Sequence, residues 1–178
     1  SGFNCVLTDT GGFIQNLPTT LVESFKSTLE EASDSDFIIH VIDNSADNIT
    51  AHYDTVKGLM EELDMTAIPQ IIFFNKTDLN DEMNLIPAEH SVYVSKNTPP
   101  EEMNKHLEDF MKKEFEDYKV ELPAENMHLY YSLKSATIIE SSGLDEETGT
   151  LKVEGHSPEG GWIERIVGSD DISGAKSD

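Results

Sequence analysis

Four consecutive residues, Asn75-Lys76-Thr77-Asp78, directly follow an apolar run that ends at Phe74. Guanine carries two neighbouring donors, its ring N1–H and its exocyclic amine, and a single carboxylate can accept both hydrogen bonds. Asp78 can therefore select guanine by a charge-assisted bidentate contact, because adenine has no matching pair of donors. Lys76 can lay its alkyl stem along the base while its ammonium stays in solvent, and the Asn75 amide can bridge the base and neighbouring loops. Taken alone, the tetrapeptide is better explained as a simple strand-to-loop turn.

Two further segments occupy similar places in the sequence. Asp9-Thr10-Gly11-Gly12 ends the apolar run of residues 3–8. A carboxylate there can hold Mg²⁺ through water, and the Gly12 amide can approach a γ-phosphate without a Cβ in the way. A glycine-rich turn with a capping Asp is the alternative. Ser95 and Lys96 follow the last short apolar run, where backbone amides can meet the guanine carbonyl oxygen. Together and in this order, the three segments predict a guanine-nucleotide site.

The elements that would position these segments alternate between short apolar runs and amphipathic helices. Strands are expected over residues 3–8, 37–42, 68–74 and 91–94. Apolar residues at helical spacing predict helices over residues 18–32, 49–63 and 103–115. Near-continuous apolar strands separated by helices predict an α/β fold, with a parallel sheet covered on both faces. Ligands bind beyond the carboxyl ends of such strands, which is where all three segments fall.

The character of the sequence changes after about residue 118. Short strands are expected over residues 120–122, 137–140, 150–154 and 162–167, with a helix over residues 124–134. These elements predict a small α+β domain over residues 118–167. Residues 168–178 are polar and rich in Ser, Asp and Gly, which predicts a disordered tail.

Composition limits the classes of partner. Acidic residues outnumber basic ones 35 to 12, giving a formal charge of −23. Nucleic-acid binding needs clustered Lys and Arg, so this charge argues against a nucleic-acid patch in the segment and against docking to an anionic membrane. No apolar stretch approaches the roughly 20 residues of a membrane span. Cys5 is the single cysteine and lies in an apolar run, where we expect it to be buried. These features suit a soluble protein of the reducing cytoplasm.

Several runs of the sequence resemble a known protein family. The runs Asp9 to Pro18, Leu21 to Phe25 and Thr28 to Glu31 closely resemble HflX-type GTPases, and His40 to Asp43 and Phe74 to Asp78 continue the match. The resemblance implies that residues 1–117 are the C-terminal portion of a P-loop GTPase domain with a Rossmann-like parallel sheet. It also implies that residues 118–167 form the small C-terminal domain.

The resemblance implies a role for each motif. Asp9 and Gly12 would sense Mg²⁺ and the γ-phosphate as switch II. The expected nucleotide-binding residues are Asp9, Gly12, Asn75, Lys76, Asp78, Ser95 and Lys96. Phe13 occupies the place where Ras-like GTPases carry the Gln that orients the attacking water. An aromatic ring cannot orient water, so hydrolysis would be slow and would depend on a partner. The family implies that this partner is the large ribosomal subunit.

Three departures separate the chain from the family pattern. Gly11 replaces an apolar residue, which would loosen switch II, and Lys96 replaces a small Ala at the last guanine contact, where a backbone amide remains available. No G-x-x-x-x-G-K-[ST] motif occurs in the 178 residues. We therefore expect a fragment of a GTP-binding protein that binds GTP weakly and does not hydrolyse it. A sheet lacking its opening strands would expose an edge, through which two copies can pair. The alternative is a nucleotide-free interaction module derived from the GTPase fold.

Overall fold

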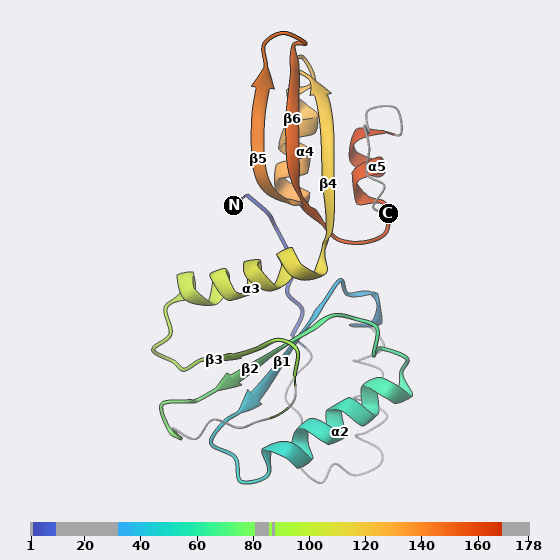
Figure 1. Ribbon diagram of the computed structural model, residues 1–178. Helices are drawn as coiled ribbons and strands as arrows, with labels where there is room; N and C mark the ends of the chain where they lie inside the picture. Colours follow the sequence, from blue (N-terminus) through green and yellow to red (C-terminus); the bar gives the residue numbers. More distant parts are fainter. Residues whose placement is uncertain (1, 10–31, 81–85, 87, 169–178) are drawn as a thin grey trace. The chain divides into compact units, whose positions relative to one another are not determined.

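The computed structural model describes residues 2–9, 32–80, 86 and 88–168 (Figure 1). The chain divides into two compact units: Thr8–His106, and a second unit formed by Ser1–Leu7 with Leu107–Asp178. Gly12, Phe13, most of the helix predicted over residues 18–32 and nearly all of the predicted tail lie outside the described residues.

The first unit contains a three-stranded parallel sheet. Its elements are the 3₁₀ helix Ala32–Asp34, β1 Ile38–Asp43, α2 Ile49–Glu62, β2 Gln70–Asn75, β3 Ser91–Tyr93 and the start of α3 Pro100–Glu114. The strand order is β1-β2-β3, with Ile38 opposite Gln70 at one end of the β1–β2 register and Asp43 opposite Asn75 at the other. The three strands run in the same direction (Figure 1). The predicted α/β fold with a parallel sheet is confirmed.

Burial explains why these residues form this sheet. The central strand β2 is a continuous apolar run, and its four residues from Ile71 to Phe74 are all buried. Helix α2 places Ile49 beside Ile42 and Phe74 in one apolar cluster. The Phe74 and Tyr93 rings stack with their centroids 4.9 Å apart, joining β2 to β3. The outer strand β1 is less covered, since Val41 stays 59% exposed.

The strand predicted over residues 3–8 is not formed. Residues 2–9 have no regular secondary structure, and Cys5, expected to be buried, is exposed. Phe3 packs edge-to-face on Phe115 at 6.1 Å, and the Asn4 N–H donates to the Ser135 carbonyl at 2.9 Å. These contacts attach the start of the run to the second unit, so its later residues gain no strand partner. Val6 is 94% exposed as a result.

The second unit is a small α+β arrangement, as predicted. Its elements are β4 Glu116–Pro123, α4 Met127–Ala136, β5 Ile138–Asp145, β6 Thr150–Ser157 and α5 Trp162–Val167. The antiparallel sheet has the order β4-β6-β5 (Figure 1). Alternate β4 residues Tyr118, Val120 and Leu122 are buried and share one apolar core with Leu133 of α4 and Val153 of β6.

Residues 162–167 form helix α5, so the strand predicted there is wrong. Ile163 and Val167 are four residues apart and both join the core, which matches helical spacing. Gly161 precedes the helix with φ 73°, a left-handed conformation that favours glycine and that turns the chain into α5. Among the residues that the structure describes, no helix has both the length and the apolar character needed to cross a membrane.

Candidate functional site

An open pocket of about 580 Å³ lies beyond the carboxyl ends of the strands in the first unit. This volume falls within the range typical of small-ligand sites. Its lining residues come from β1, β2, the segments that follow β2 and β3, and the start of α3: Val41, Phe73, Asn75, Lys76, Asp78, Leu79, Val94, Ser95, Lys96 and Met103. Val41 and Leu79 are 59% and 65% exposed. The pocket therefore presents apolar surface with a few polar groups, which suits a flat ring with polar edges.

The turn after β2 is held in one shape by its own hydrogen bonds. Lys76 has φ 64°, and its N–H donates to Asn75 Oδ1 at 2.8 Å. The Leu79 N–H closes the turn on the Lys76 carbonyl at 3.0 Å. Thr77 ties the turn to the residue that follows β3, because its N–H and its hydroxyl both donate to the Val94 carbonyl, at 3.2 and 3.0 Å. The side chains on either side of Thr77 are thereby presented at the pocket.

Lys76 forms an ion pair with the carboxylate of Asp43, the last residue of β1. Its Nζ donates to Asp43 Oδ2 at 2.6 Å, across 33 residues of sequence. The Ser45 N–H and hydroxyl donate to Asp43 Oδ1 at 2.9 and 2.6 Å. The hydrogen bond from Lys76, followed by those from Ser45, lowers the pKa of Asp43 from 3.8 to about 2. The ion pair fixes the far end of the Lys76 side chain and leaves its stem along the pocket wall.

Asp78 is paired with a different lysine. Lys96 Nζ lies 3.2 Å from Asp78 Oδ2, and the two residues come from the loops after β3 and β2. The Asp78 side chain is 20% exposed, whereas the Lys96 side chain is 76% exposed. The carboxylate is thus held in the wall of the pocket while the ammonium has freedom to move.

The loop that follows β3 uses its own amides internally. The Ser95 N–H donates to Thr98 Oγ1 at 2.9 Å, and the Thr98 N–H donates back to the Ser95 carbonyl at 3.0 Å. The Asn97 N–H donates to Ser95 Oγ at 3.1 Å. The amide of Ser95, which the sequence offered as a contact for a carbonyl oxygen, is therefore already engaged.

A pair of asparagines joins the loops after β1 and β2, and sequence reasoning missed this brace. Asn44 Nδ2 donates to the Asn80 carbonyl at 3.0 Å, and Asn80 Nδ2 donates to the Asn44 carbonyl at 3.1 Å. Asn44 is 1% exposed, and its N–H donates to the Asn75 carbonyl at 2.8 Å. The only sequence signal was the position of Asn44 directly after a predicted strand. Because buried amides are costly unless paired, this brace fixes the spacing of the two loops.

The structure brings together five of the predicted site residues around one pocket: Asn75, Lys76, Asp78, Ser95 and Lys96. Their part in nucleotide binding stays a prediction. Asp9 is exposed and is not among the described residues that line the pocket, while Gly12 and Phe13 lie outside the described residues. Within the described ranges, no group of three or more His, Cys, Asp or Glu side chains is arranged to hold a metal ion.

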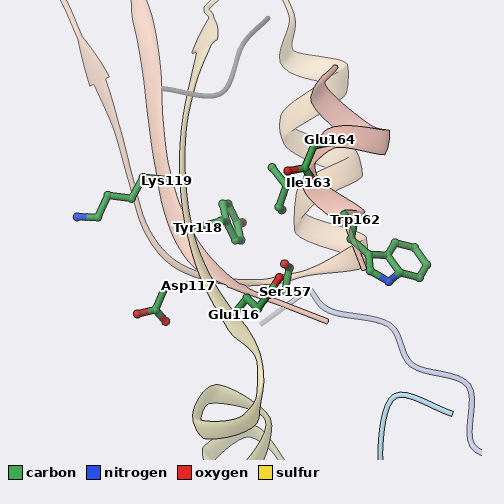
Figure 2. A pocket seen from close by; sticks show the side chains of 9 residues that line it. Glu116, Asp117, Tyr118, Lys119, Ser157, Trp162, Ile163 and Glu164 are labelled. Carbon is green, nitrogen blue, oxygen red and sulfur yellow. The ribbon is translucent and has the colours of Figure 1, made fainter. Parts of the chain in front are cut away.

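A second, much smaller pocket of about 60 Å³ lies in the other unit (Figure 2). Tyr118 of β4 and Ile163 of α5 lie on one side of the strand, and Asp117 and Lys119 point to the other side (Figure 2). The Tyr118 hydroxyl is within 2.7 Å of Thr137 Oγ1, so it has a partner inside the core. This pocket has room for a few water molecules and not for a nucleotide.

Known proteins resemble the chain over most of its length. It is 35% identical over 163 residues to the GTPase HflX of Alkalihalophilus pseudofirmus, a match that covers 89% of this chain and 38% of that protein. It is 32% identical to the GTPase HflX of Caldanaerobacter subterraneus subsp. tengcongensis, over 86% of this chain and 36% of that protein. A shorter match to the GTPase HflX of Akkermansia muciniphila reaches 51% identity over 77 residues. No protein-family model matches the chain. The chain thus spans little more than a third of the length of the relatives that it matches most fully.

Proposed function

Because the sequence is that of a segment of an HflX-type GTPase, we propose that the pocket beyond β2 and β3 binds the base of a guanine nucleotide. The single observation that carries the proposal is the Asp78 carboxylate, which is presented in the pocket wall with one-fifth of its side chain exposed. A carboxylate at that position accepts hydrogen bonds from both donors on the edge of guanine. The exposed apolar side chains of Val41 and Leu79 supply surface for the flat ring.

Lys76 supports the same reading. Its ammonium is occupied by Asp43 at 2.6 Å, so the alkyl stem is the part of the side chain left for a ligand. Because the ion pair with Asp43 already holds the end of the Lys76 side chain, its alkyl chain can cover the face of a base without losing further conformational freedom. The braces from Thr77 to Val94 and between Asn44 and Asn80 keep this arrangement formed before the ligand arrives.

Titration of the chain with guanosine 5′-monophosphate (GMP) tests the proposal. The amide NMR signals of residues 75–79 and 95–98 should shift, with an affinity of about millimolar, because few contacts offset the entropy of binding. Adenosine 5′-monophosphate (AMP) should cause much smaller shifts in the same signals. Asp78→Ala should greatly reduce the preference for guanine, whereas Asp54→Ala, which removes an exposed carboxylate from α2, should leave it intact. Equal shifts with both nucleotides in the unchanged chain would refute the proposal.

We further propose, from the resemblance, that the whole protein binds GTP and GDP, hydrolyses GTP and acts with the large ribosomal subunit. The 178-residue chain contains no G-x-x-x-x-G-K-[ST] motif, so by itself it should release no phosphate from GTP. Asp9 is an exposed carboxylate, which fits a residue that holds Mg²⁺ through water while phosphate oxygens supply the other ligands. Magnesium would neutralise phosphate charge there. Cosedimentation of the whole protein with large ribosomal subunits, with GTP and with GDP, tests the partner.

A further inference from the structure

The edge of guanine presents three groups in a row: the exocyclic amine, the N1–H and the carbonyl oxygen. The first two are donors, and the third is an acceptor. Asp78 supplies acceptors for the first two, so a complete reading of the edge needs a donor placed directly beside one carboxylate oxygen. In this structure that place is taken by Lys96, whose Nζ lies 3.2 Å from Asp78 Oδ2.

We propose that the side chain of Lys96 is a specificity-determining residue that donates a hydrogen bond to the carbonyl oxygen of guanine. Asp78 and Lys96 together then present two acceptors and one donor in the order that guanine requires. An ammonium has three N–H donors, so Lys96 can keep its bond to Asp78 and donate to the base at the same time. The inference rests on the proposed function, because it concerns the same site.

The surrounding loop favours the side chain as the donor. The backbone amides on both sides of Lys96 are committed: the Ser95 N–H to Thr98 Oγ1 at 2.9 Å and the Asn97 N–H to Ser95 Oγ at 3.1 Å. Releasing either one would break a hydrogen bond of the loop. The Lys96 side chain is 76% exposed, so it can adjust by small rotations without leaving a packed environment. The side chain is therefore a lower-cost donor than either neighbouring amide, and the backbone N–H of Lys96 is retained in Lys96→Met, so that variant tests the side chain alone.

The same lysine would reject adenine. Adenine carries an amino group where guanine carries its carbonyl oxygen, so the ammonium of Lys96 would face another donor. Asp78 would meet an unprotonated ring nitrogen at the neighbouring position, which sets two acceptors against each other. Each half of the ion pair thus opposes adenine independently, and removing one half should weaken discrimination without eliminating it.

In the rival role, Lys96 acts as a plug: its ammonium competes with guanine for the Asp78 carboxylate, so the ion pair must break before guanine binds. The two roles predict opposite signs. A donor makes Lys96→Met bind GMP less tightly, and a plug makes the same variant bind GMP more tightly. The exposure of Lys96 limits either effect, since exposed ion pairs contribute at most about 1 kcal/mol, which corresponds to about a fivefold change in affinity.

The experiment compares GMP with its 6-thio analogue, in which sulfur, a poor acceptor, replaces the carbonyl oxygen. Dissociation constants come from NMR titrations of the unchanged chain, Lys96→Met and the control Lys57→Met, which removes an exposed lysine from α2. Mildly acidic pH keeps the N1 proton on the analogue. Any attraction of lysine for phosphate is common to both nucleotides, so it cancels in the ratio of the two constants.

We expect Lys96→Met to weaken GMP binding about two- to fivefold and to bring the two nucleotides close to equal affinity. Lys57→Met should preserve the preference of the unchanged chain for GMP. Equal or tighter GMP binding by Lys96→Met, with guanine still preferred over adenine, overturns the role of Lys96 and leaves the proposed function standing. Absence of GMP binding to the unchanged chain overturns both.

Discussion

Replacing Lys76 by methionine is expected to raise the pKa of Asp43, because the hydrogen bond from Lys76 is the largest cause of its fall to about 2. Methionine keeps most of the apolar stem and removes the ammonium that lies 2.6 Å from Asp43 Oδ2. The Ser45 N–H and hydroxyl still donate to the other carboxylate oxygen. The pKa should therefore move toward 3.8 without reaching it.

The size of the stability change follows from that shift. A fall from 3.8 to about 2 is nearly two pKa units, which sets an upper bound of about 2.5 kcal/mol on the stabilisation. The side chains of Asp43 and Lys76 are 40% and 51% exposed, so solvent screens the pair. We expect Lys76→Met to lower the free energy of unfolding at neutral pH by no more than about 1 kcal/mol.

The sign of the pH dependence is fixed by the direction of the shift. Because folding lowers the pKa of Asp43, its contribution is complete above the unfolded value near 3.8 and is lost as the pH falls toward about 2. The difference in stability between the unchanged chain and Lys76→Met should therefore shrink across that window. Urea unfolding measures the stability, and carboxyl ¹³C NMR measures the pKa of Asp43.

Lys57→Met in α2 is the matched control, since it makes the same change in net charge away from Asp43. It should leave the pKa of Asp43 where it is. The reasoning fails if Asp43 titrates at the same pH in Lys76→Met as in the unchanged chain. It also fails if the loss of stability stays constant from neutral pH to the acid end of the window.

Two other substitutions test packing inside the second unit, and a third tests how the stability of the first unit depends on pH. Gly155→Ala would place a Cβ 2.2 Å from the Ile138 carbonyl oxygen, so urea unfolding should show a loss of about 1–3 kcal/mol, with little change for Gly143→Ala, which meets nothing within 4 Å. Leu133→Ala should cost about 2–5 kcal/mol, because Leu133 is fully buried in the core of the second unit. Burial lowers the pKa of His40 below 6.5, so stability should fall as the pH drops below that value. His40→Phe should reduce this loss of stability at acidic pH, as measured by urea unfolding at several pH values above and below 6.5. An unchanged loss of stability would exclude His40 as its cause.

The parts of the fold that the sequence predicted are those with a strong local pattern. The run Ile71 to Phe74 is apolar without interruption and forms the buried strand β2. Ile49, Met60 and their neighbours repeat at helical spacing and form α2. Polar residues follow each strand, and in a parallel sheet the strand ends meet at one edge. The position of each motif directly after a strand was therefore enough to place Asp78 and Ser95 at the same edge, and both line one pocket.

The wrong predictions concern segments whose structure depends on distant partners. The run 3–8 reads as a strand, yet Phe3 packs on Phe115 and Asn4 bonds to Ser135, more than 100 residues away in sequence. Residues 162–167 contain Ile and Val, which are common in strands, but the four-residue spacing of Ile163 and Val167 matches a helix packed on the core. Local propensity was overridden by tertiary contacts in both places.

The ion pairs at the pocket could not be predicted either. Lys76, Asp78 and Lys96 line the pocket and Asp43 ends β1, and the sequence does not say how these two lysines and two carboxylates pair. In the structure, Asp43 forms an ion pair with Lys76, and Asp78 forms an ion pair with Lys96. The shorter pair, at 2.6 Å, anchors a side chain that a ligand would lie against, and the longer pair, at 3.2 Å, involves a highly exposed ammonium. Asp43 therefore fixes the ammonium of Lys76, so Lys76→Met tests that ion pair, whereas Lys96→Met tests the separate pair at Asp78.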